Sequence, residues 1–107
     1  MSLDIYFSQV QETTVHEQNI THNLNKMADA AGFYKALWRP DEHGITKAKE
    51  LLPFLEKGLE DMKSNPEKYK PLSASNGWGT YEQFIPWIER LIEACKEYPE
   101  SNITVSR

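Results

Sequence analysis

Residues 3–8 read Leu-Asp-Ile-Tyr-Phe-Ser, and their apolar and polar side chains alternate strictly. Alternation with a period of two is typical of a β-strand that buries one face. Gln9 to Glu12 is polar enough to turn, and Thr13 to Ile20 is rich in β-branched residues, so we expect it to return antiparallel. Because a hairpin alone is marginally stable, we expect Asn102 to Ser106 to pair with it as a third strand.

The middle of the chain carries the spacing and the capping residues of helices. Thr21 or Asn23 is placed to cap a first helix, and Gly32 is placed to stop it. Thr46 to Lys63 carries a continuous apolar stripe, which predicts a second helix. Pro53 lies inside this stripe, so it either kinks the helix or begins a second segment.

A last helix is predicted before the C-terminal strand. Asn65-Pro66-Glu67 favours one more helical turn, and Thr80 and Gln83 have the spacing of a capping box that opens the last helix. Pro86 predicts a kink near the start of this helix, which ends by Tyr98-Pro99. The sequence therefore predicts an α+β fold: a three-stranded antiparallel sheet, made of an N-terminal hairpin plus a C-terminal strand, packed against about three helices.

Composition limits the classes of protein to which the chain can belong. It has 107 residues, 39% of them hydrophobic, and a formal net charge of −4, so we expect residues 1–107 to form a single compact domain. Only three arginines are present, which argues against an extended nucleic-acid groove. The sequence contains no run of roughly 18 apolar residues, so we expect no membrane-spanning helix. The single cysteine, Cys95, and the lack of a signal-like N-terminus favour the cytoplasm.

No strong catalytic or metal motif is present. The three histidines, His16, His22 and His43, show neither the H-E-x-x-H pattern nor the spacing of a structural zinc site. Gly-rich phosphate loops and the G-x-S-x-G turn are also missing. We therefore expect no catalytic residues, no metal and no cofactor.

Three clusters of residues are candidates for a binding site. In the first, residues 19–25, a strand passes directly into a helix, which aims backbone N–H groups outward and favours an anion. His22, Asn23 and Asn25 add side-chain donors there. The alternative is that Thr21 or Asn23 merely caps the helix while His22 packs.

The second cluster is Trp38-Arg39. An arginine beside a large aromatic is suited to holding a carboxylate or phosphate next to a stacking surface. The alternative is that Trp38 covers the edge of the core while Arg39 pairs with Asp41 or Glu42.

The third cluster is residues 76–82, where one glycine precedes Trp78 and Gly79 follows it. This pattern allows unusual backbone geometry and leaves the indole accessible, so Trp78 and Tyr81 could sandwich a planar ring while Glu82 or the helix N-terminus reads its polar edge. The alternative is that Trp78 folds onto the core and closes a gap. If the first and third clusters meet, they form one pocket with donors on one wall and aromatics on the other.

The same strings carry a resemblance. N-I-T-H-N-L at 19–24, A-G-F-Y-K-A-L-W-R-P at 31–40 and N-G-W-G-T-Y-E at 76–82 resemble small uncharacterised proteins encoded by tailed phages and prophages. The stretch 91–107 is also similar, so the likeness spans nearly the whole chain. It implies a phage accessory protein that acts inside an infected bacterium, and it assigns no site residues.

The leading hypothesis is a protein that binds and sequesters a small ligand, a nucleotide-derived host immune signal, without turnover. Phosphates suit helix N-termini and a purine suits aromatic stacking. The residues expected to bind the ligand are His22, Asn23, Arg39, Trp78 and Tyr81.

Two other functions stay open. The first is a protein–protein interaction module that inhibits a host defence protein through exposed aromatics, which predicts a flat apolar patch. The second is a small hydrolase that uses His22 with Glu82 or Glu17, which predicts a perturbed carboxylate in the cleft. A homo-oligomer is also conceivable, since a strand at a sheet edge can pair across a two-fold axis.

Overall fold

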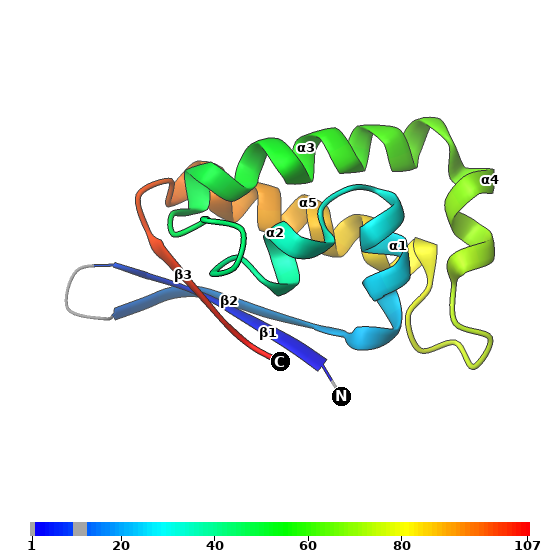
Figure 1. The fold of residues 1–107 in the computed structure, drawn as a ribbon, viewed down its shortest axis with the longest axis horizontal. Helices are drawn as coiled ribbons and strands as arrows, with labels where there is room; N and C mark the ends of the chain where they lie inside the picture. Colours follow the sequence, from blue (N-terminus) through cyan, green and yellow to red (C-terminus); the bar gives the residue numbers. More distant parts are fainter. Residues whose placement is uncertain (1, 10–12) are drawn as a thin grey trace.

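The computed structural model describes residues 2–9 and 13–107, and it has a sheet on one side and helices on the other (Figure 1). The strands are β1 (Ser2–Gln9), β2 (Thr13–Thr21) and β3 (Asn102–Ser106), in the order β2-β1-β3 and antiparallel throughout. The predicted sheet of a hairpin plus a C-terminal strand is therefore confirmed. Most of the turn predicted at Gln9 to Glu12 lies outside the described residues.

The helical layer contains two long helices and several short ones. Their bounds are η2 (His22–Leu24), α1 (Asn25–Ala30), α2 (Tyr34–Trp38), α3 (Ala48–Ser64), α4 (Pro66–Tyr69), η3 (Lys70–Leu72) and α5 (Tyr81–Glu97), where η marks a 3-10 turn. Helices α3 and α5 have 17 residues each and pack against each other. The expected α+β fold is thus present, and the expected number of helices is roughly right.

The alternation in the central strand decides which side of the sheet is covered. Leu3, Ile5 and Phe7 of β1 are fully buried against the helices, while Asp4 and Tyr6 point to the opposite face. The inner stripe of α5 completes this core with Phe84, Ile88, Leu91 and Cys95. One face of the sheet is therefore apolar and covered, and the other face is polar.

Helix α3 is continuous through its proline. It runs from Ala48 to Ser64 without a break, so the alternative in which a second segment begins at Pro53 is wrong. Pro53 removes the N–H that would bond the carbonyl of Lys49, but both residues are exposed, so water can hydrate that carbonyl. The helix starts later than Thr46 because Glu50 accepts hydrogen bonds from the N–H groups of Thr46 and Lys47.

The first helical segment, η2 followed by α1, is bounded by a capping residue at its start and a glycine after its end. Thr21, rather than Asn23, is the cap, because its hydroxyl accepts the N–H of Asn23 at 3.3 Å. A 3-10 turn then leads into α1, which ends at Ala30, and Gly32 follows as the predicted stop. Gly32 has a φ of 88°, and the N–H groups of Gly32 and Phe33 bond back to carbonyls of α1.

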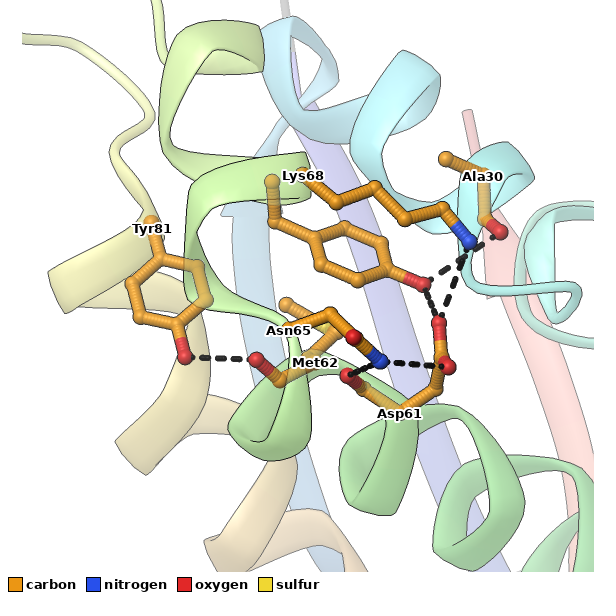
Figure 2. Close-up of polar contacts among 7 residues, drawn as sticks. Ala30, Asp61, Met62, Asn65, Lys68 and Tyr81 are labelled. Carbon is orange, nitrogen blue, oxygen red and sulfur yellow. Dashed lines mark hydrogen bonds and ion pairs between the residues drawn. The ribbon is translucent and has the colours of Figure 1, made fainter.

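A polar cluster fixes the corner between α3 and α4 (Figure 2). The hydroxyl of buried Tyr69 donates to the carboxylate of Asp61 and lies 3.4 Å from the carbonyl oxygen of Ala30 in α1. Asn65 and Lys68 also donate to this carboxylate, at 3.0 and 3.2 Å. These contacts hold the beginning of the segment that leads to Trp78.

The same cluster predicts a dependence of stability on pH. Hydrogen bonds from Tyr69 and Lys68 lower the pKa of the Asp61 carboxyl, so the folded state prefers its charged form. A carboxyl with a lowered pKa stabilises the fold above its unfolded pKa of about 3.9, and this stabilisation is lost as the pH falls through the lowered value.

We expect Tyr69→Phe to keep the ring packing but to reduce the free energy of unfolding at pH 7 by about 1 kcal/mol, since one hydrogen bond is lost. The variant should also lose less stability than the wild type between pH 5 and acid pH, measured by urea unfolding. Tyr6→Phe, on the polar face of the sheet, is the control. Equal dependence of stability on pH in the wild type and Tyr69→Phe would show that the Tyr69 hydroxyl does not lower the pKa of Asp61.

Candidate functional site

The loop that carries Trp78 is held by hydrogen bonds on both sides of this residue. The N–H of Trp78 donates to the side-chain oxygen of Asn76 at 3.0 Å, and its carbonyl accepts from Nδ2 of Asn23 at 2.8 Å. The next N–H, that of Gly79, donates to Oε1 of Gln83 at 3.1 Å. The main chain is therefore fixed, while the Trp78 side chain is 71% exposed.

Gly79 brings this loop against the turn that follows β2. Its φ is 105°, a conformation that residues with a side chain rarely adopt. A Cβ atom at this position would lie 3.0 Å from Cγ2 of Thr21, 3.1 Å from Cβ of Asn23 and 3.2 Å from Cγ of Leu24. The positive φ and these tight distances both favour glycine at the point where the two segments approach.

The two segments enclose an open cleft of about 880 Å³, which we call the Trp78 cleft. It is lined by Ser2, Asn19, Ile20, Thr21, His22, Asn23, Asn76, Trp78, Gly79 and Gln83. The structure thus brings the first and third sequence clusters together, with amides and hydroxyls around one accessible aromatic.

The lining of the Trp78 cleft is uncharged apart from the titratable ring of His22. No Asp, Glu, Lys or Arg is among the residues that line it. Amides and hydroxyls supply both donors and acceptors, and the indole supplies a face for stacking. This surface suits a neutral polar ring more than a free phosphate.

His22 forms part of the wall and is backed by Trp38. The two rings meet edge-on with centroids 6.3 Å apart. Nε2 of His22 and Nε1 of Trp38 are both buried and have no hydrogen-bond partner among the described residues. Trp38 therefore supports the ring of His22 from the core.

Other predicted site residues lie away from this cleft. Trp38 is 2% exposed and stacks on Tyr34, as in the alternative that made it a core residue. Arg39 forms an ion pair with Glu42 at 2.9 Å, also as in the alternative for that cluster. Neither residue lines the Trp78 cleft.

The start of α5 also differs from the expected binding geometry. The hydroxyl of Tyr81 donates to the carbonyl of Met62 at 2.7 Å (Figure 2), so Tyr81 does not face Trp78 across the cleft. The N–H of Tyr81 donates to Ser73, and that of Gln83 donates to Thr80 in the predicted capping box. These donors of the helix N-terminus are thus already used.

The remaining predicted residues, Glu82 and Asn25, lie in different places. Glu82 is exposed on the first turn of α5 and does not line the Trp78 cleft. Asn25 lines a second cleft of about 520 Å³, which we call the Lys26 cleft. Its lining residues are His22, Asn23, Asn25, Lys26, Pro71, Leu72, Ser73 and Ala74, so the two clefts share His22 and Asn23.

Some lining residues carry no signal of a binding site in the sequence. Gln83 was predicted only as a helix cap, and it does cap α5 while lining the cleft. Ser2 reaches the site because it pairs with Thr21 across the hairpin. The register of the hairpin is the signal that would have identified Ser2, and it depends on the length of the turn.

The chain matches no protein-family model, no curated protein and no solved structure. Within residues 2–9 and 13–107, no group of three His, Cys, Asp or Glu residues is arranged to hold a metal ion. None of the helices in this described part is long and apolar enough to span a membrane.

Cys95 lies in the core on α5 and is not a nucleophile at neutral pH. Burial is the main cause that raises the pKa of its thiol to about 12, and Glu56 adds a smaller electrostatic effect. Because the thiolate is the reactive form, we expect no labelling of the folded protein by iodoacetamide at pH 8 and full labelling in denaturant, measured by mass spectrometry. Stoichiometric labelling of the folded chain would contradict this placement.

Gly79 and Gly77 form a matched pair for testing the close approach. Both have positive φ, at 105° and 80°, but a Cβ atom at Gly77 meets nothing within 4 Å. We expect Gly77→Ala to cost about 1 kcal/mol from backbone strain alone, and Gly79→Ala to cost about 2–4 kcal/mol because contacts with the turn add to it. Urea unfolding measures both, and equal losses would show that the approach is looser than described.

Proposed function

We propose that the chain binds a small ring-bearing ligand in the Trp78 cleft and sequesters it without turnover. The observation that carries this proposal is an indole that is 71% exposed on a main chain fixed by hydrogen bonds on both sides. The resemblance to phage-encoded proteins suggests the setting, an infected bacterium. In that setting a nucleotide-derived host immune signal is the ligand class that we favour.

The fixed loop favours binding of a ligand on physical grounds. Ordering a flexible loop on association reduces affinity, and this loop is already ordered by contacts to Asn23, Asn76 and Gln83. A base that stacks on an aromatic side chain gains about 1–3 kcal/mol. The amides around the indole can then bond the polar edge of the ring.

Binding without turnover fits the residues of the cleft better than hydrolysis does. A hydrolase that used His22 would need a carboxylate within reach of it. Glu17 and Glu82, the two partners considered from the sequence, do not line the Trp78 cleft. The cleft therefore offers the means to hold a ligand and no partner that would activate water.

A protein partner is the alternative, since exposed tryptophans are frequent anchors of protein interfaces. The two exposed large hydrophobic residues in the described chain are Trp78 and Phe54. They lie on different elements, and the ring of Phe54 is covered at one edge by His43, with centroids 5.2 Å apart. The observed arrangement is one aromatic in a polar cleft, which favours the small ligand.

Tryptophan fluorescence tests the proposal directly, because Trp38 and Trp87 are 2% and 5% exposed and only Trp78 faces solvent. We expect one member of a nucleotide and cyclic-nucleotide panel to change the emission of the wild type. At 100 times its dissociation constant it should stabilise the fold by about 2.7 kcal/mol. Trp78→Ala should weaken binding by about 5- to 150-fold, since about 1–3 kcal/mol of stacking is lost.

Phe54→Ala removes the other exposed aromatic and is the matched control, which should bind like the wild type. Denaturing the complex should return the ligand with unchanged mass. A panel without any effect, or equal binding by Trp78→Ala, contradicts the proposed function. Recovery of a cleaved ligand contradicts sequestration and supports an enzyme.

A further inference from the structure

The Lys26 cleft adjoins the Trp78 cleft and differs from it in charge. The two clefts share His22 and Asn23, so these two residues lie where the clefts meet. Lys26 is the single charged residue among those that line the Lys26 cleft. It is exposed and makes no ion pair with any residue of the described chain.

The other groups of the Lys26 cleft are also able to donate hydrogen bonds. The oxygen of the Ser73 hydroxyl accepts the N–H of Tyr81 at 2.9 Å, which leaves its hydrogen free to donate. The amide of Asn25 adds a further donor at the start of α1. An ammonium, a hydroxyl and an amide can all donate hydrogen bonds to the oxygens of a phosphate group.

The linings of the two clefts contain no acidic residue, although the chain is acidic. The sequence contains 16 Asp and Glu residues, yet none of the residues that line either cleft is acidic. A carboxylate beside Lys26 would neutralise it and repel an anion. Its absence from the lining leaves the positive charge of Lys26 available to a ligand.

We propose that the two clefts form one bipartite site for a nucleoside phosphate, with the ring on Trp78 and the anionic group at Lys26. This inference rests on the proposed function, because it extends the ligand of the Trp78 cleft into the Lys26 cleft. His22 and Asn23 lie between the two parts of the ligand. Asn23 also holds the carbonyl of Trp78, so it couples the position of the ring to that of the anion.

Calorimetric titration of the full chain with matched pairs of probes tests this site. The probes are adenosine against adenosine 5′-monophosphate, and guanosine against guanosine 5′-monophosphate. We expect one monophosphate to bind about tenfold more tightly than its nucleoside, the effect of one charge-assisted contact at an exposed site. That preference should shrink as salt is raised, since exposed charges are screened.

Lys26→Gln should remove the preference for the monophosphate and leave the affinity for the nucleoside unchanged. Lys35→Gln is the matched control, because Lys35 on α2 is also exposed and forms no ion pair with the described residues. Trp78→Ala should weaken the nucleoside and the monophosphate equally. Circular dichroism of each variant establishes that it is folded.

The outcomes separate the two proposals. Equal affinity of the wild type for nucleoside and monophosphate overturns the bipartite site. A preference for the monophosphate that survives Lys26→Gln also overturns it. In both cases the Trp78 cleft still binds the ring, so the proposed function stands. If Lys35→Gln loses the preference for the monophosphate as fully as Lys26→Gln does, the bipartite site is also overturned, because the preference then comes from the net charge of the protein. No binding of any of the four probes overturns the bipartite site, while the wider nucleotide and cyclic-nucleotide panel still decides the proposed function.

Discussion

The close approach of Gly79 to the turn at Thr21–Leu24 is the constraint on which the candidate site depends. A side chain at Gly79 would meet three residues of that turn. The approach lets Asn23 reach the carbonyl of Trp78, 55 residues away in the sequence. Because Asn23 lines both clefts, this contact lies at the border that the two clefts share. Strands and helices bring the segments near each other, and the missing Cβ atom allows them to touch.

The position of the site at one end of β2 follows from the packing of α5. Strand β2 lies at the edge of the sheet, where it would leave backbone groups without partners. Trp87 covers this edge: its indole N–H donates to the carbonyl of Asn19 at 2.7 Å, and its own carbonyl accepts from the side chain of Gln18 at 3.1 Å. Helix α5, which begins just after Gly79, therefore also covers the edge of β2, the strand that leads to Thr21. Core packing and site geometry are fixed by the same helix.

Local signals made much of the fold predictable, and the site was less so. The alternation in residues 3–8, the capping box at Thr80 and the stop at Gly32 act within a few residues, and each was predicted from the sequence. The contact between Asn23 and Trp78 depends on how α3 and α5 stack, which no local pattern encodes. Tyr81 is a second example. The sequence predicted that it would stack with Trp78, but α5 packs on α3 and the Tyr81 hydroxyl donates to a carbonyl of α3 instead.

The acidic balance of the chain is compatible with an anionic ligand because its charges are arranged unevenly. Several acidic residues of α3 and α5 are paired with lysines, as Glu89 with Lys63 and Glu56 with Lys96. Charges beyond a Debye length of about 8 Å are largely screened at physiological salt, and no acidic residue lines the cleft beside Lys26. A net charge of −4 still slows the approach of an anion, since long-range steering is unfavourable. In the proposed function, sequestration would depend less on fast capture than on slow release, to which contacts such as that of the fixed indole of Trp78 would contribute.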